Sequence, residues 1–389
     1  MITGSRRSLC MKKIIIASDS FKGCLTSLEV ARAAEEGIRK VLPDCGVVGI
    51  PVADGGEGTT EALVTAMKGH FVSCEVHDPL MNRICAEYGI LGDGLTAVIE
   101  MSSAGGLTLV PPEKRNPMLT TTYGVGELIK DALQKGCRRF LTGIGGSATN
   151  DAGTGLLQAL GFRFLDRNGN ELGKGGQILE QITHIDSDKT IPELKQSVFT
   201  VACDVNNPFS GENGAAYVYA RQKGADDTMI RQLDEGLKQF AAVIDASSGK
   251  NIDALPGAGA AGGLGGGLHA FLGAELKPGI QMVLEALDFD HRIQHADLII
   301  TGEGKLDRQT GMGKTPAGIL EAAKRQQIPV VAIAGAVEET DALLQQGLLA
   351  VMSVQPYPVS LEQAMDKSFA YQQIKRVVEQ IIRLRINNR

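Results

Sequence analysis

The chain has 389 residues, of which 43% are apolar and 22% charged; this is ordinary for a globular protein and long enough for two domains. A net charge of −6, with no long basic tract, argues against nucleic acid as a partner. No apolar run is long enough to cross a membrane, and residues 1–10 lack the apolar segment of a secretory signal. We therefore expect a cytoplasmic protein, monomeric or homodimeric, whose residues 1–10 are a tag or an upstream extension outside the fold.

The seven cysteines are scattered along the chain, odd in number, and never form a Cys-x-x-Cys pair. This pattern favours reduced thiols over a disulfide framework or a zinc site.

The first elements alternate between strand and helix. Residues 12–18 (KKIIIAS) predict a buried strand, and residues 27–42 predict a helix with Val30, Ala34 and Ile38 on one apolar face. A second strand at 47–52 and a second helix at 59–69 follow. Because apolar strands alternate with helices, this segment is typical of a parallel sheet covered on both faces.

The pattern then changes to extended runs at 71–80, 83–91 and 95–106, and an Asp-Gly turn separates the last two. Together these runs predict an antiparallel meander. Helix, strand and helix return at 120–136, 138–146 and 152–161. Residues 162–173 predict a hairpin with an Asn-Gly turn. A strand at 197–205, a helix at 228–245 and, at 256–273, a glycine cluster that leads into a helix come next.

The last part of the chain again alternates between strand and helix, as its first part does. Its predicted strands, each followed by a helix, are at 296–304, 329–336 and 349–354. We therefore predict an α/β fold in which a doubly wound parallel-sheet domain, Rossmann-like or flavodoxin-like, has a second α/β domain inserted into it. Residues 11–70 and 288–389 would form the first, discontinuous domain, and residues 71–287 the inserted one.

The loop TGIGGSATNDAGTG, residues 142–155, is rich enough in glycine for its amides to approach a phosphate closely. Gly143, Gly145 and Ala148 match the dinucleotide fingerprint, and Asp166 stands about twenty residues further on. An NAD(P)-dependent hydroxy-acid dehydrogenase is therefore one alternative. It is disfavoured because Asp166 opens the DRNGN turn and does not end a second parallel strand.

The segment QTGMGKTP contains the Gly-Lys-Thr of a P-loop, but Arg308 occupies the position where the first glycine belongs. Thr315 as N-cap and Pro316 as the first helical residue explain the segment better. Lys314 beside this helix terminus could still bind an anion. His291 and His295 could share a helix face, but no third metal ligand is near, so a surface role is favoured.

Polar loops follow several of the apolar strands, where the carboxyl ends of parallel strands form the ligand crevice of an open sheet. They are SDSFKG at 18–23, ADGGEG at 53–58, GGSATND at 145–151, CDVNNP at 203–208 and GEGKLD at 302–307. Carboxylates suit Mg²⁺, and lysines and glycine amides suit phosphate, so together these loops are typical of phosphoryl transfer. Each acid alone could equally be a helix cap or a turn residue.

The chain resembles the bacterial glycerate kinases of the glycerate 2-kinase type. The resemblance extends from Met11 to the C-terminal helix and rests on the order of these loops together with four further motifs: IEMSSAGGL, EKRNPMLTTTYGVGELI, QKGA and PGAGAAGG. The resemblance implies D-glycerate, ATP and Mg²⁺ as reactants, phosphoglycerate and ADP as products, and two α/β domains. The chain departs from the family's usual residues at Tyr219–Arg221, before QKGA, and at Lys305–Leu306. Neither departure removes an acid, but either could alter substrate preference.

For this reaction the sequence suggests a hypothesis for each residue. The catalytic candidates are Asp204 as the first choice for the base, Asp151 as the second, and Lys22 for the glycerate carboxylate. Substrate-binding candidates are Ser20, Asp54, Ser147 and Asn150. Candidates for ATP phosphates are Gly145, Gly146, Gly302 and Lys314, and those for Mg²⁺ are Glu303 and Asp307, with Asp54 a further choice. A non-catalytic sugar-acid-binding protein remains a second alternative.

Overall fold

The computed structural model describes residues 11–307, 310, 313–338 and 341–387. Residues 1–10, expected to be a tag or extension, lie outside that description. The chain divides into two compact parts: a discontinuous unit of residues up to Asp54 and from Val283 onward, and a central unit, Gly55–Met282. Residues 55–70 thus lie in the central unit and 283–287 in the discontinuous one, on the other side of the division from their expected places.

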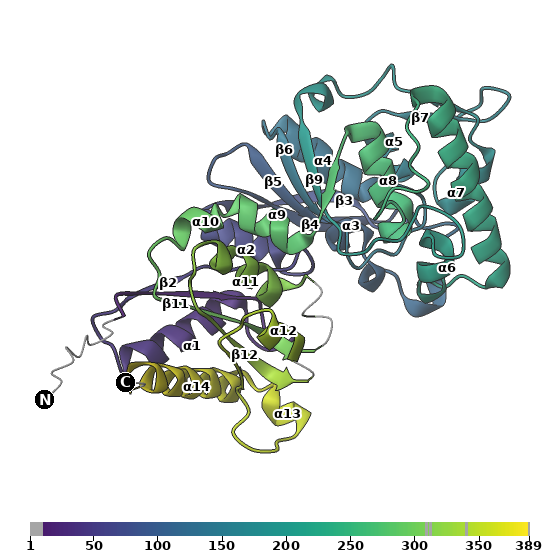
Figure 1. The fold of residues 1–389 in the computed structure, drawn as a ribbon. Coiled ribbons are helices and arrows are strands. Elements are labelled where there is room, and N and C mark those ends of the chain that lie inside the picture. Colours follow the sequence, from purple (N-terminus) through teal and green to yellow (C-terminus); the bar gives the residue numbers. More distant parts are fainter. Residues whose placement is uncertain (1–10, 308–309, 311–312, 339–340, 388–389) are drawn as a thin grey trace, which may run out of the picture. The chain divides into compact units, whose positions relative to one another are not determined.

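The discontinuous unit is built on one parallel five-stranded sheet (Figure 1). Its strands are β1 (Lys13–Ser18), β2 (Gly46–Gly49), β11 (Leu298–Leu306), β12 (Val330–Val337) and β13 (Ala350–Ser353). The spatial order β2-β1-β11-β12-β13 is the flavodoxin-like order of a doubly wound fold. In such a sheet the strand order reverses beside the first strand, so the ligand crevice is expected where β1 and β11 end.

The helices of this unit are α1 (Ser27–Arg39), α10 (Phe289–Arg292), α11 (Thr315–Arg325), α12 (Asp341–Gln345), α13 (Leu361–Ala364) and α14 (Lys367–Asn387). A reciprocal capping box between Thr26 and Glu29 begins α1. Helices α1 and α14 lie side by side (Figure 1). Gly37 permits their close approach, since a Cβ there would lie 2.5 Å from the Lys375 carbonyl oxygen.

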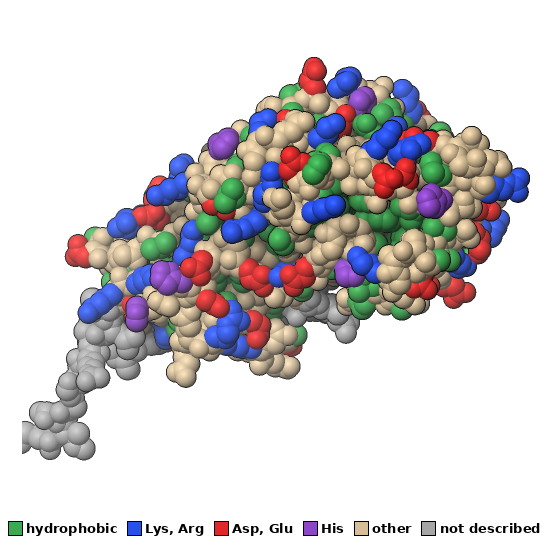
Figure 2. Space-filling view, turned by 90° about the horizontal axis from the view of Figure 1, so that it is seen from above, with side chains coloured by type: hydrophobic (Ala, Val, Ile, Leu, Met, Phe, Trp, Pro, Cys, Tyr) green, Lys and Arg blue, Asp and Glu red, His purple; other side chains and the backbone are tan. Residues whose placement is uncertain are grey.

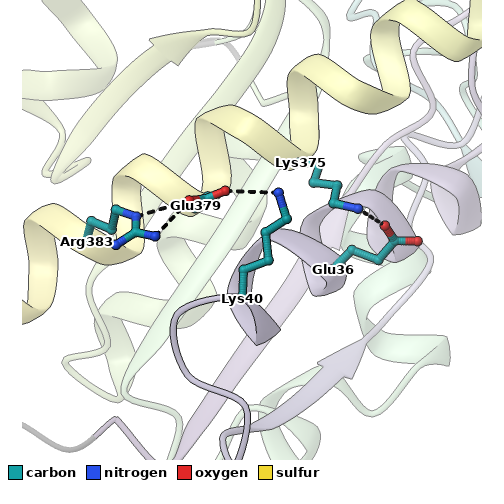
Figure 3. A network of polar contacts seen from close by, with 5 residues as sticks. All are labelled: Glu36, Lys40, Lys375, Glu379 and Arg383. Atoms are coloured by element: carbon teal, nitrogen blue, oxygen red, sulfur yellow. Dashed lines mark hydrogen bonds and ion pairs between the residues drawn. The ribbon is translucent and has the colours of Figure 1, made fainter.

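Ion pairs line the seam between α1 and α14 (Figure 3). Lys375 pairs with Glu36, and Glu379 accepts hydrogen bonds from Lys40 at 3.2 Å and from Arg383 at 2.9 Å. Exposed pairs of this kind each contribute about 0–1 kcal/mol, so the buried apolar face, with Ile38, Ile374 and others, holds the two chain ends together.

The central unit has a mixed six-stranded sheet in the order β10-β9-β6-β5-β4-β3. Its strands are β3 (His70–His77), β4 (Arg83–Ile90), β5 (Thr96–Glu100), β6 (Arg139–Gly143), β9 (Val198–Ala202) and β10 (Glu275–Lys277). Its helices are α2 (Thr59–Ala66), α3 (Ser102–Gly105), α4 (Tyr123–Gln134), α5 (Thr154–Ala159), α6 (Ala215–Tyr219), α7 (Asp227–Ser248) and α8 (Ala260–Leu272); α9 (Gly279–Ala286) begins in this unit. The predicted meander, β3 to β5, is confirmed as antiparallel, and β5, β6, β9 and β10 run parallel.

One local prediction is confirmed and extended, and another needs correction. The chain turns at 166–170 as predicted, with an antiparallel bridge between Leu165 and Glu171, and β7 (Arg163–Leu165) pairs in addition with the distant β8 (His184–Asp186). Helix α11 has Lys314 as its N-cap, with Thr315 first and Pro316 second, one residue earlier than predicted. The side chain of Lys314 makes no cap hydrogen bond.

Figure 2 shows Lys and Arg side chains interspersed with Asp and Glu over the face in view, without a large region of one sign. The described part of the chain contains no helix with both the length and the apolarity for a membrane crossing. The six cysteines within the described ranges are all free thiols, as expected.

Candidate active site

The end of β1 carries a buried carboxylate. The Asp19 amide donates to the Gly302 carbonyl at 2.9 Å, which keeps β1 and β11 paired up to this point, and the Ser20 amide donates to Asp19 Oδ1 at 2.6 Å. Only 2% of Asp19 is exposed. Burial, and then the nearby negative charge of Asp54, raise the pKa of Asp19 to about 7. A carboxyl group that titrates near neutrality at a strand end is typical of a functional site.

A tight turn after Asp19 presents Lys22. The Phe21 amide donates to the Leu25 carbonyl at 2.8 Å, and Gly23, with φ of +76°, closes the turn. Lys22 Nζ lies 3.3 Å from Asp54 Oδ2, and 57% of the lysine side chain remains exposed. Since the ion pair is partly open to solvent, Lys22 can still meet an anionic ligand.

The end of β11 adds a second buried acid. Glu303 is 7% exposed and accepts a hydrogen bond from the hydroxyl of Thr310. Burial raises the pKa of Glu303, while that hydrogen bond and the charge of Lys314 oppose the rise. Lys314 stands at the N-terminus of α11, where the helix dipole also favours an anion.

These groups line one cavity of about 790 Å³ within the discontinuous unit. Six of the predicted residues lie on its wall: Ser20, Lys22, Asp54, Glu303, Asp307 and Lys314. Gly302 has another role, since a Cβ there would lie 2.3 Å from the Ile333 carbonyl oxygen, so its glycine serves the packing of β11 against β12. Asp19 also lines the cavity; the sequence placed it in a candidate loop but gave it no role.

The glycine loop after β6 belongs to the central unit and is held firmly. The Gly146 carbonyl accepts from the Leu107 amide at 2.8 Å, and the Ala148 amide donates to the Gly105 carbonyl at 2.9 Å. Gly145 and Gly146 are exposed, and Gly146 has φ of +72°. The loop therefore presents exposed backbone on a fixed frame, as an anion-binding loop requires.

Beneath this loop lies a lysine that the sequence analysis did not select. Lys223, from the QKGA motif, is 1% exposed; its Nζ donates to Ser147 Oγ at 2.7 Å and to the Thr149 carbonyl at 2.6 Å. Burial lowers the pKa of Lys223 to about 7, although Asp151 opposes the shift. Asn150 is fully buried, and neither its Oδ1 nor its Nδ2 has a hydrogen-bond partner among the described residues.

Asp151 is fully buried and holds the loop to the start of α4. Its carboxylate accepts from the Thr122 amide at 2.8 Å, the Thr122 hydroxyl at 2.9 Å and the Gly153 amide at 3.2 Å. Burial raises its pKa, and these hydrogen bonds oppose the rise. Asp204 differs: it is exposed just beyond β9 and accepts from the Gly279 amide at 2.9 Å, at the start of α9. The predicted acids and amides are thus shared between the two units.

Two alternatives from the sequence find no support. The carboxylate of Asp166 accepts hydrogen bonds from the amides of Asn168 and Asn170 at 2.8 and 2.9 Å. It therefore stabilises its own turn, which does not support a role in binding the ribose of a dinucleotide. His291 is a surface residue, with 74% of its side chain exposed. Within the described ranges, no three His, Cys, Asp or Glu side chains are close enough together to hold a metal ion by themselves.

A doubly wound sheet with carboxylates and lysines at its ligand edge, together with a rigid glycine loop, defines an α/β enzyme for phosphorylated or acidic small molecules. Comparison with known proteins is more specific. The family model described as "Glycerate kinase family" matches residues 14–386, so the chain belongs to the glycerate kinase family.

Relatives named glycerate kinase match along nearly the whole chain. A "Glycerate kinase" of Halalkalibacterium halodurans is 50% identical over 92% of this chain and 94% of its own length. The "Glycerate 2-kinase" of Escherichia coli K12 is 49% identical over 88% of this chain and 90% of its own length. A crystal structure from Salmonella typhimurium LT2, provisionally assigned as glycerate kinase 2, superposes with a TM-score of 0.89 at 44% identity and covers 96% of this chain and 98% of its own. The resemblance that the motifs indicated is confirmed.

Proposed function

We propose that the protein transfers the γ-phosphoryl group of ATP to D-glycerate, at the 2-hydroxyl, to give 2-phosphoglycerate and ADP. Membership of the glycerate kinase family carries the reaction, and the relative named glycerate 2-kinase supports the position. The cluster of Asp19, Lys22, Asp54 and Glu303 where β1 and β11 end supplies the charged groups that phosphoryl transfer needs. The cytoplasmic location and the monomeric or dimeric state remain predictions.

Lys22 and Lys314 are proposed to bind the anionic groups of the substrates, with Ser20 as a hydrogen-bonding partner. Asp54 is proposed to have two roles. Its ion pair holds Lys22 at the cavity, and its own carboxylate can bind part of a ligand's polar surface. Both lysines come from fixed backbone, a tight turn and a helix start, so little ordering is needed on binding.

Glu303 and Asp307 fit a magnesium ion bound jointly by protein and phosphate. Magnesium commonly takes one or two carboxylates and fills its other positions with phosphate oxygens and water, so the lack of a three-acid cluster among the described residues is consistent with it. Burial disfavours the charged form of Glu303, and a nearby cation would restore it. The ion would neutralise charge on the phosphates. Thr310 holds the Glu303 carboxylate in place.

In the central unit, Asp204 is proposed to orient the attacking hydroxyl and accept its proton. Asp204 is exposed, and the Gly279 amide donates a hydrogen bond that helps to fix its carboxylate. Gly145 and Gly146 offer amides to an anionic group, and Ser147 and Asn150 offer polar side chains. Asp151 is better assigned to holding this loop, because threonine and glycine donors already surround its carboxylate.

The experiment is a coupled assay of ADP release from Mg-ATP with D-glycerate, with no acid, and with D-lactate, which lacks the 3-hydroxyl. ADP release that depends on D-glycerate supports the proposal. Release of ADP only at the no-acid rate, from folded protein, contradicts it.

A further inference from the structure

The cavity of the discontinuous unit has a second part that the charged groups do not explain. Besides its acids and lysines, the wall includes apolar side chains of the segment that follows β13 and reaches into α14: Val354, Tyr357, Leu361, Met365 and Ala370, with Phe21 from the turn after β1. Val354 and Ala370 are buried, while Tyr357 and Leu361 are exposed. We call these residues the apolar wall.

The size of the cavity exceeds what glycerate or an ion would fill. Pockets of about 300–1,000 Å³ enclose a ligand of drug size and are lined mostly by apolar groups with a few placed polar ones. At about 790 Å³ this cavity lies in that range. Glycerate offers no apolar surface to the apolar wall, whereas a nucleotide carries a flat, largely apolar base at one end and a charged phosphate chain at the other.

One polar atom in the same wall lacks a partner. Gln355 follows β13 and lines the cavity, and its Oε1 is buried without a hydrogen-bond donor from any described residue. A buried amide oxygen left unpaired is unfavourable, so a ligand N–H that reached it would be bound selectively. Adenine carries an amino group on its six-membered ring where guanine carries a carbonyl oxygen, and only the amino group can donate.

We propose that this cavity is the adenosine subsite of the enzyme. The adenine ring lies against the apolar wall, its amino group donates to Gln355 Oε1, and the phosphates extend toward Lys22 and Lys314. The nature of the nucleotide rests on the proposed function, but its location rests on the cavity itself. The discontinuous unit therefore binds the nucleotide and selects adenine over guanine.

The test is a fluorescence titration of the full chain with N-methylanthraniloyl-ADP and Mg²⁺, followed by displacement with ADP and with GDP, without glycerate. Ala336→Trp, which fills the cavity from an exposed position on its wall, is expected to weaken binding at least tenfold. Gln355→Ala is expected to weaken ADP about tenfold and GDP much less, so that the ADP preference falls. Ala342→Trp and Gln345→Ala, exposed on α12 outside the cavity, are the matched controls and should bind as wild type.

Tyr357→Ala guards against a folding failure of the tryptophan variant, since it trims a 56% exposed side chain and is expected to weaken ADP several-fold. Folded Gln355 and Tyr357 variants that bind ADP like wild type, in a protein that phosphorylates glycerate, would overturn the location and leave the function standing. Tight ADP binding that these variants weaken, in a protein inactive on glycerate, would support the location and remove the function. A wild-type protein that binds no nucleotide overturns both.

Discussion

At the scale of single residues, exposure separates the acids into two kinds. Asp151 and Asp204 both follow strands and looked interchangeable in the sequence, but the first is fully buried among donors and the second is exposed and accepts from the Gly279 amide. The sequence could indicate that acids gather at strand ends, because the runs before them are apolar. It could not show that the Asp151 carboxylate is surrounded by donors, since two of them come from Thr122, 29 positions away along the chain.

Replacing Asp204 by Asn tests its role as base. Asn retains an oxygen that can accept from the Gly279 amide, so the fold should be kept, but the proton acceptor is lost. We expect kcat to fall about a hundredfold or more. The exposed Glu212→Gln in the same unit is the control and should keep its activity. Steady-state kinetics decide, and a folded Asp204→Asn with less than a tenfold loss would remove Asp204 as the base.

Asp19 should make stability depend on pH. Its folded-state pKa, about 7, lies above the ordinary value of 3.8, so the folded protein binds the extra proton and loses stability as pH rises from about 4 to 7. Asp19→Asn removes the buried charge and should therefore gain stability relative to wild type at pH 8, by roughly 1 kcal/mol or more, and little at pH 4. Urea unfolding at both pH values measures this difference, and the exposed Asp44→Asn should show no pH-dependent gain. An equal effect at both pH values would contradict the shift.

The residue that sequence reasoning missed most clearly is Lys223. Lysine is expected at the surface, so nothing in its immediate neighbours suggested a buried role. Only its place in the QKGA motif set it apart, and the structure shows why position matters: its ammonium group supports Ser147 and the carbonyl of Thr149 from below.

At the scale of elements, the sequence predicted the strands and helices with strong periodicity, but it did not predict which strands pair with each other. The strands β1, β11 and β12 each contain a run of consecutive apolar, buried residues, as expected of a sheet covered on both faces. The pairing of β7 with β8 was missed because β8 has three residues and a half-exposed pattern with little periodicity. The glycine cluster at 256–273 was expected to lead into a helix, but the positive φ of residues 261–263, which brings Gly262 against Thr149 and Asn150, was not predicted.

The glycine loop as an element should depend on Asp151 for its stability. Asp151→Ala leaves the amides of Thr122 and Gly153 buried without their acceptor, and each such loss costs about 1–3 kcal/mol. We expect the free energy of unfolding to fall by about 2–5 kcal/mol, measured by urea denaturation. Asp186→Ala, a partly exposed acid of the same unit, should cost much less. A loss of activity from Asp151→Ala at unchanged stability would return Asp151 to the catalytic group.

At the scale of the whole molecule, the alternation of strand and helix at both chain ends indicated a discontinuous doubly wound unit, and the flavodoxin-like strand order supports that fold. The boundary could not be placed well because the helix at 59–66 has the same pattern as the helices of the first unit, although it packs in the central one. The family could be recognised from the sequence without knowing the order of the strands, because the polar loops occur along the chain in the order typical of the family.

The measurement that tests the account most directly is phosphorus NMR of the product formed from Mg-ATP and D-glycerate. The account predicts a new phosphate ester signal split by a single proton, that of the 2-carbon, while ADP appears in equal amount. A signal split by two protons would place the phosphate on the 3-hydroxyl and correct the position. No new ester signal, from folded protein that has been given both substrates and Mg²⁺, would contradict glycerate phosphorylation itself.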